Sequence, residues 1–184
     1  VEGDARALSR FIAKYLAKSE RLTSPKFMVG ESYGGFRAPK VAHLLQTGEG
    51  VGIAGMVLVS PVLDFASQRD SAANFAATVA RLPSMAAARR ERDGPLNRAR
   101  LADAERYAAG DYLLDLARGP RDAAAVERIA KNIAQFTGLD AALVRRLGGR
   151  VDARTFAREF YRGEARVGSA YDVTVSGFDP NPAA

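Results

Sequence analysis

The sequence predicts an α/β fold, and three observations support this prediction. The first 60 residues follow the order helix, strand, helix, strand, which is typical of a parallel α/β unit. Residues 26–30 form a short apolar run that predicts a strand, and residues 53–60 are a second, nearly all-apolar run, as expected for a strand covered on both faces. From residue 66 to about residue 162 alanine, arginine and leucine recur with helical periodicity.

Two amphipathic helices are expected around the first strand. In residues 4–18 the apolar side chains recur at helical spacing, so one face of this segment should be buried; they are Leu8, Phe11, Ile12, Tyr15 and Leu16. The second helix follows Gly35 and should end at Thr47 and Gly48. Pro39 should kink or loosen it, because proline lacks the backbone N–H of a helical hydrogen bond.

The remainder of the chain is predicted to be a series of short helices followed by one strand. Breaks are expected at prolines and glycines, namely Pro83, Gly94-Pro95, Gly119-Pro120, Gly138 and Gly148-Gly149. Residues 171–176, YDVTVS, alternate like a strand, and residues 177–184 form a proline-rich tail.

Composition limits the possible chemistry. The chain has 184 residues, 47% of them hydrophobic, which is enough for one ordinary globular core. Without cysteine, it can form neither disulfides nor thiolate metal sites, and it has no cysteine nucleophile. No apolar run approaches the roughly 20 residues of a membrane-spanning helix. We therefore expect a soluble protein with no membrane partner.

The net charge of +6 comes mainly from arginine, clustered at residues 89–92 and at Arg145, Arg146 and Arg150. These arginines alternate with alanine and acidic residues in helical segments, which favours solvated helix faces. Nucleic-acid binding is the alternative. Since no recognisable nucleic-acid motif accompanies them, we expect no nucleic-acid partner.

One sequence motif indicates a catalytic function. Gly30-Glu31-Ser32-Tyr33-Gly34 fits G-x-S-x-G, the nucleophile elbow, in which a serine lies on a sharp turn between a strand and a helix. The glycines two residues before and after the serine are expected to avoid a clash across this turn. The next backbone N–H, that of Tyr33, would then point at a developing oxyanion.

The longer run from Met28 to Gly35, MVGESYGG, resembles the active-site signature of serine carboxypeptidases. Pro39 stands where that family commonly has a proline, and residues 24–27 resemble the segment before the signature in its bacterial members. Residues 55–61 resemble the next core strand. The helical stretch after Asp64 is similar to the family's lid. The resemblance implies a partial α/β-hydrolase fold with a large helical lid insertion.

That resemblance also implies a domain layout and a set of site residues. Residues 1–65 would be a partial hydrolase core, residues 66–168 the lid, and residues 169–184 a return strand and tail. The implied reaction is hydrolysis of a C-terminal peptide bond through an acyl-enzyme on Ser32. The Tyr33 N–H would contribute to the oxyanion hole, Glu31 would bind the terminal carboxylate of the peptide substrate, and the elbow glycines would be Gly30, Gly34 and Gly35. No metal or other cofactor is expected, since the sequence has one histidine and no phosphate-binding loop.

The sequence lacks a base for Ser32. His43 is the only histidine, and 11 residues along a helix place it roughly 16 Å from Ser32. Asp64, Asp172 and Asp179 do not match the family's pattern for the triad acid and are interpreted as structural. In that family the triad acid and histidine follow the lid, so we expect this chain to be a central piece of a longer hydrolase.

Two further hypotheses stay open. The chain could be a catalytically inactive hydrolase fragment that acts as a protein-interaction module, through association with the rest of the hydrolase or with itself. Esterases, lipases and acyltransferases use the same fold, and only the Glu31-Ser32-Tyr33 core favours a carboxypeptidase.

Overall fold

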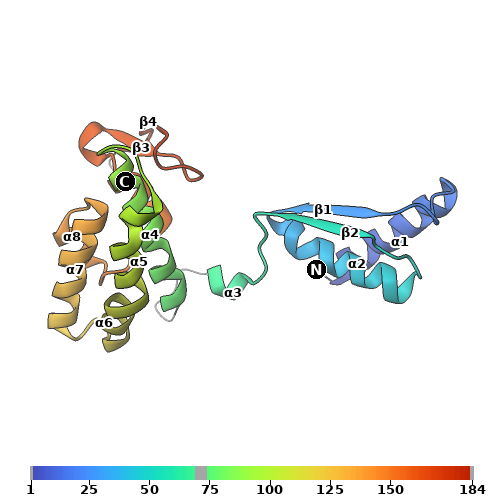
Figure 1. Ribbon diagram of the computed structural model, residues 1–184, viewed down its shortest axis with the longest axis horizontal. Helices are drawn as coiled ribbons and strands as arrows, with labels where there is room; N and C mark the ends of the chain where they lie inside the picture. Colours follow the sequence, from blue (N-terminus) through green and yellow to red (C-terminus); the bar gives the residue numbers. More distant parts are fainter. Residues whose placement is uncertain (1, 69–73, 183–184) are drawn as a thin grey trace. The chain divides into compact units, whose positions relative to one another are not determined.

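A computed structural model describes residues 2–68 and 74–182. The described part of the chain is mostly helical, with 60% helix and 9% strand. It divides into two compact units, Val1–Ala66 and Ser67–Ala184. Figure 1 labels the helices and strands of both units.

The prediction of an α/β-hydrolase fold is wrong for this structure. Among the described residues there are two sheets of only two strands each, and no extended parallel sheet. Two of the predicted strands do pair in parallel, but the third predicted strand, residues 171–176, is largely a turn. The sequence therefore supplies a single strand-helix-strand unit, and helices make up most of the rest.

The first unit is built around that strand-helix-strand unit. Its elements are α1 (Glu2–Lys18), β1 (Phe27–Glu31), α2 (Tyr33–Gly48) and β2 (Gly55–Val59), and α3 (Phe65–Gln68) begins at its end. The strands pair in register, with Phe27 opposite Gly55 and Glu31 opposite Val59. Because the strands are parallel, both carboxyl ends lie at the same edge of the sheet.

The core of the first unit lies between α1 and α2. Leu16, Val41 and Leu45 are buried there, and Leu8 and Ile12 pack against them. The predicted amphipathic face of α1 is only partly confirmed, since Phe11 and Tyr15 are exposed. The helix α2 ends at Gly48, as predicted, and runs through Pro39 without interruption.

Only one face of this sheet is covered. Figure 1 shows α1 and α2 on the same side of β1 and β2. On the other side Phe27, Val29, Val57 and Val59 are exposed to between 45% and 72%. We call these four residues the open sheet face. The prediction that the second strand, residues 53–60, is covered on both faces is therefore wrong for the described residues.

The second unit is a helical cluster followed by a small hairpin. Its helices are α4 (Phe75–Glu91), α5 (Ala102–Tyr107), α6 (Leu113–Arg118), α7 (Ala123–Thr137), α8 (Ala141–Arg146) and α9 (Ala153–Glu159), with short 3₁₀ turns at Arg98–Leu101 and Arg162–Glu164. A π-helical turn, Ala108–Tyr112, joins α5 to α6 without a break. Asn74, Asp122 and Asp152 cap the first turns of α4, α7 and α9 through their side chains.

Most of the predicted helix breaks are confirmed. Helices end just before Gly94-Pro95, Gly119-Pro120 and Gly148-Gly149, and Gly138 caps α7 in the left-handed conformation. The prediction of a break at Pro83 is wrong, because α4 continues through this proline. Burial of Leu82 and Met85 on either side of Pro83 offsets the backbone hydrogen bond that proline removes.

In the core of the second unit, Tyr112 of the π-helical turn contacts the backbone that follows α8. Tyr112 is almost fully buried, and its hydroxyl donates a hydrogen bond of 2.7 Å to the carbonyl of Gly149. Gly149 has a φ of 78°, and a Cβ there would lie 2.2 Å from Cγ2 of Ile129. A glycine is therefore required for its backbone conformation and for its close approach to α7.

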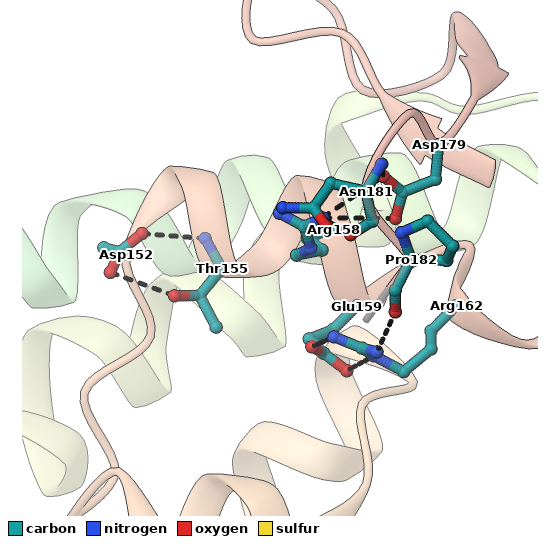
Figure 2. Close-up of polar contacts among 8 residues, drawn as sticks. All are labelled: Asp152, Thr155, Arg158, Glu159, Arg162, Asp179, Asn181 and Pro182. Atoms are coloured by element: carbon teal, nitrogen blue, oxygen red, sulfur yellow. Dashed lines mark hydrogen bonds and ion pairs between the residues drawn. The ribbon is translucent and has the colours of Figure 1, made fainter. Parts of the chain in front are cut away.

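An ion pair and hydrogen bonds hold the end of the described chain against α9. The strands β3 (Arg166–Gly168) and β4 (Ser176–Phe178) pair antiparallel. Arg158 of α9 pairs with the buried carboxylate of Asp179 at 3.2 Å and also donates to the carbonyl of Asn181 (Figure 2). Arg162 pairs with Glu159 at 2.6 Å and reaches the carbonyl of Pro182.

A polar turn replaces most of the strand predicted for residues 171–176. The carboxylate of Asp172 accepts hydrogen bonds from both the backbone N–H and the hydroxyl of Thr174. These bonds hold the pKa of Asp172 below its usual value. Such local side-chain hydrogen bonds compete with strand pairing, so the strand β4 begins only at Ser176.

Two neighbouring glycines provide a test of the second core. Both Gly148 and Gly149 have positive φ, but a Cβ on Gly148 would meet nothing within 4 Å. We expect Gly149→Ala to lower the free energy of unfolding by about 2 kcal/mol more than Gly148→Ala, because it also overlaps Ile129. Urea unfolding followed by far-UV circular dichroism measures the difference. Equal losses in the two variants would contradict the packing described.

Candidate functional site

Ser32 lies on a strained turn between β1 and α2. Its φ of 53° and ψ of −116° are rarely adopted by residues other than glycine. Serine at the start of a helix usually accepts a hydrogen bond from a first-turn N–H, but Ser32 makes no such bond. Its side chain is exposed. The turn therefore presents the Ser32 hydroxyl to solvent instead of using it to cap α2.

Backbone hydrogen bonds from the end of β2 hold this conformation. The Ser32 N–H donates to the carbonyl of Val59, and the Ser32 carbonyl accepts from the N–H of Val62, both at 3.0 Å. The same carbonyl accepts from the N–H of Gly35 at 3.0 Å. We call residues 59–62 the clamp segment. It includes Ser60, another serine with positive φ, at 42°.

Two of the three elbow glycines are sterically required. A Cβ on Gly30 would lie 2.3 Å from the carbonyl oxygen of Gly34, and a Cβ on Gly35 would lie 2.3 Å from Cβ of Pro61. A Cβ on Gly34 would meet nothing within 4 Å. The clash expected two residues after the serine is therefore absent at Gly34, and the close approach occurs one residue later.

The two residues beside Ser32 lie at the end of β1 and at the start of α2. Tyr33 is the first residue of α2, so its backbone N–H has no acceptor within the helix, and the helix dipole adds positive potential there. Glu31 is exposed at the end of β1. By strand alternation its side chain lies on the same side of the sheet as Val29.

An aromatic cluster beside the elbow was not predicted. The ring of Phe36 lies 5.9 Å from that of Tyr33 and 5.1 Å from that of Phe65, measured between centroids. The guanidinium of Arg37 lies 4.8 Å from the Tyr33 ring and pairs with Asp4 of α1 at 2.9 Å. These contacts fix the first turn of α2. Tyr33 and Phe36 are three residues apart, a spacing that predicts neighbouring side chains on one helix face. No sequence pattern predicts that Phe65 contacts them.

Among the described residues, no side chain makes a hydrogen bond with the Ser32 hydroxyl. His43 is exposed on α2, three turns beyond Ser32, and borders an apolar groove between α1 and α2. Its distance from Ser32 along the helix is about 16 Å, which rules out a direct hydrogen bond. The structure therefore exposes the Ser32 hydroxyl at the N-terminus of α2 and places His43 too far away to act as its base.

Asp64, Asp172 and Asp179, which the sequence analysis interprets as structural, each accept hydrogen bonds or pair with an arginine. Asp64 accepts a hydrogen bond from the N–H of Ala66 at the start of α3. Asp172 forms the polar turn with Thr174, and Asp179 pairs with Arg158. Over residues 2–68 and 74–182, no group of three or more acidic or histidine side chains could hold a metal ion. Within the same ranges, no helix is both long and apolar enough to cross a membrane.

Many arginines of the basic clusters have acidic partners. Arg89 pairs with Asp93 and Arg90 with Asp103, both at 2.7 Å. Arg92 pairs with Glu164 and Arg145 with Glu127. The Arg90 guanidinium holds the pKa of Asp103 below its usual value. This pairing reduces the positive field that these arginines offer to a polyanion and favours the interpretation of solvated helix faces.

Comparisons of the chain with protein-family models, with curated proteins and with solved structures each gave no match. The likeness to serine carboxypeptidases therefore rests on sequence patterns alone, chiefly on residues 28–35 around Ser32.

The elbow can be tested with two glycines of the same turn. We expect Gly30→Ala to destabilise the first unit by at least about 2 kcal/mol, because its Cβ would overlap the Gly34 carbonyl. Gly34→Ala should be neutral or slightly stabilising, since Gly34 is helical and has open space around it. Amide hydrogen exchange of residues 27–48, read by mass spectrometry, measures both. Faster exchange in Gly34→Ala than in Gly30→Ala would contradict the turn geometry.

Proposed function

We propose that Ser32 is the nucleophile of a serine carboxypeptidase-like hydrolase. The observation that carries this proposal is the strained backbone of Ser32 between β1 and α2, which exposes the hydroxyl next to the N-terminus of a helix. Strain of this kind costs of order 1–3 kcal/mol, and it is common at functional sites. A serine that only joined a strand to a helix would not need it.

In the proposed reaction the Ser32 Oγ attacks the carbonyl carbon of a C-terminal peptide bond. A base takes the hydroxyl proton, and the Tyr33 N–H donates to the oxygen that becomes negatively charged. The proton then passes to the leaving amine, and water hydrolyses the acyl-enzyme. Glu31, exposed at the end of β1, would bind the terminal carboxylate of the substrate through a shared proton, because two ionised carboxylates in contact repel.

The proposal requires a base that the described residues do not place at Ser32. A partner group from outside the described residues would have to supply it, either from the rest of a hydrolase or from another copy of the chain. Without that partner Ser32 is expected to react slowly, since general-base assistance contributes about 10²–10⁴-fold to such reactions.

Free imidazole can replace the missing base in a test of this proposal. At about pH 8, where imidazole is mostly neutral, we expect it to accelerate labelling of the chain by a fluorophosphonate probe at least tenfold. The fluorophosphonate phosphorus accepts Ser32 Oγ and releases fluoride. Intact-protein mass spectrometry should show a single adduct that disappears in Ser32→Ala.

Ser60→Ala provides the matched control. Ser60 is also exposed, also has positive φ and lies at the end of the neighbouring strand, but it does not begin a helix. Its substitution should leave the labelling rate unchanged. If imidazole has no effect, or if the adduct persists in Ser32→Ala, the assignment of Ser32 as a nucleophile is wrong.

A second candidate function is protein interaction without catalysis. The open sheet face favours it, because four apolar side chains of two strands are exposed together and soluble proteins seldom leave such patches uncovered. A sheet of two strands is also marginally stable by itself.

Self-association through the open sheet face has a direct test. We expect the chain to form dimers or larger species in sedimentation experiments, and Val57→Lys to weaken this association about tenfold by placing a charge on the face. Phe11→Lys is the control, since Phe11 is 66% exposed on α1, away from the sheet. A monomer at all concentrations, or equal effects of the two variants, would contradict the interpretation.

A further inference from the structure

The second unit contains a polar cleft that none of the sequence motifs predicts. It has a volume of about 410 Å³ and lies between α7 and the continuous helical run formed by α5, the π-helical turn and α6. Its lining residues are Tyr107, Asp111, Leu114, Asp115, Arg118, Arg128 and Asn132. Ser32 is not among them, so a function of this cleft is independent of the function proposed for the elbow.

The π-helical turn contributes directly to this cleft. Asp111 belongs to the turn, and Leu114 and Arg118 follow it at intervals of three and four residues, so they share one face of the run. Turns of this type are rare and occur frequently at functional sites. Leu114 is 61% exposed, which leaves an apolar surface between the two charged side chains.

The two outer charges of the cleft are only loosely held by the protein. Arg118 is 60% exposed, and its ion pairs with Asp115 and Asp122 are both 3.7 Å long, too long for hydrogen bonds. Asp111 is exposed and has no hydrogen bond or ion pair within the part of the chain that the structure describes. A guanidinium and a carboxylate are therefore available at separate positions along one face.

The floor of the cleft is held rigid by buried groups. The carboxylate of Asp115, only 8% exposed, receives two hydrogen bonds from Arg128, at 2.6 Å and 3.1 Å. Burial raises the pKa of Tyr107 to about 12, so its hydroxyl stays protonated. That hydroxyl lies near Asn132 but completes no hydrogen bond with any described residue. The floor thus offers a donor as well as a fixed shape.

We propose that this cleft binds a small zwitterion the size of a dipeptide, with its ammonium group at Asp111 and its carboxylate at Arg118. The two residues are seven apart, about 10 Å along the helical run, and the long arginine side chain shortens that span. An extended dipeptide covers about 7 Å between its charged ends. Its apolar side chain would lie on Leu114.

A ligand with a single charge fits the cleft less well. Asp111 and Asp115 balance Arg118 and Arg128, so the lining has no net charge to attract a simple anion or a simple cation. A zwitterion would give Arg118 a hydrogen-bonded carboxylate in addition to its two long ion pairs, would give Asp111 a cation, and brings no net charge of its own. Charge-assisted hydrogen bonds at both ends would fix its direction.

Isothermal titration of the full chain with the dipeptide Ala-Leu tests this proposal. Two capped forms serve as matched ligands: N-acetyl-Ala-Leu lacks the ammonium group, and Ala-Leu amide lacks the carboxylate. We expect Ala-Leu to bind at least tenfold more tightly than either capped form. Equal affinities for the three ligands, or no saturable binding of Ala-Leu, would overturn the proposal.

Protein variants then locate the binding. Arg118→Gln and Asp111→Asn should each weaken Ala-Leu binding at least tenfold, whereas Arg121→Gln, an exposed arginine outside the cleft, should not. Ser32→Ala should bind Ala-Leu like the unmodified chain, which separates this site from the elbow. Since Arg118 and Asp111 are exposed, their variants should keep the far-UV circular dichroism spectrum of the unmodified chain. Unchanged binding in both cleft variants would refute the assignment.

Discussion

The first unit depends on the contact between Ser32 and the clamp segment. Ser32 adopts a backbone conformation that a non-glycine residue reaches only at a cost of about 1–3 kcal/mol, so something must hold it there. Two hydrogen bonds, to Val59 and from Val62, engage both polar groups of its backbone. These bonds exist only because β1 and β2 pair in parallel and end at the same edge. The parallel pairing therefore fixes where α2 begins and which way the Ser32 hydroxyl faces.

This arrangement explains why a sheet of only two strands persists. Two strands alone are marginal in water, but here α2 connects them and packs with α1 over a core that includes Val41 and Leu45. Gly35 lets α2 approach Pro61 of the clamp segment closely. Packing beneath the sheet and hydrogen bonds at its edge therefore act together. The opposite side makes no comparable contribution within the described residues, which leaves the open sheet face exposed.

Sequence patterns predicted local features better than the fold. The strands β1 and β2, the end of α2 and the breaks at Gly-Pro pairs follow from short-range propensities, and G-x-S-x-G located the turn. The buried sides of α1 and of the strands were harder to predict, because exposure of Phe11 or Val29 depends on what packs over them and periodicity carries no such information. Likewise, Gly35 rather than Gly34 is the crowded glycine because Pro61, 26 residues away, lies against it. The polar cleft depends on a π-helical turn that leaves no recognisable sequence signal.

In the proposed role of Ser32 as a nucleophile, its position and its activation have different sources. Position comes from backbone geometry, which the strand, the turn and the clamp segment supply within one unit. Activation needs a side chain brought close from elsewhere, and the only histidine lies on the same helix as the serine. Because residues on one rigid helix keep their separation, no rearrangement of side chains can bring His43 to Ser32. A base for Ser32 would therefore have to come from outside the described residues, and the open sheet face is an apolar surface left exposed among them.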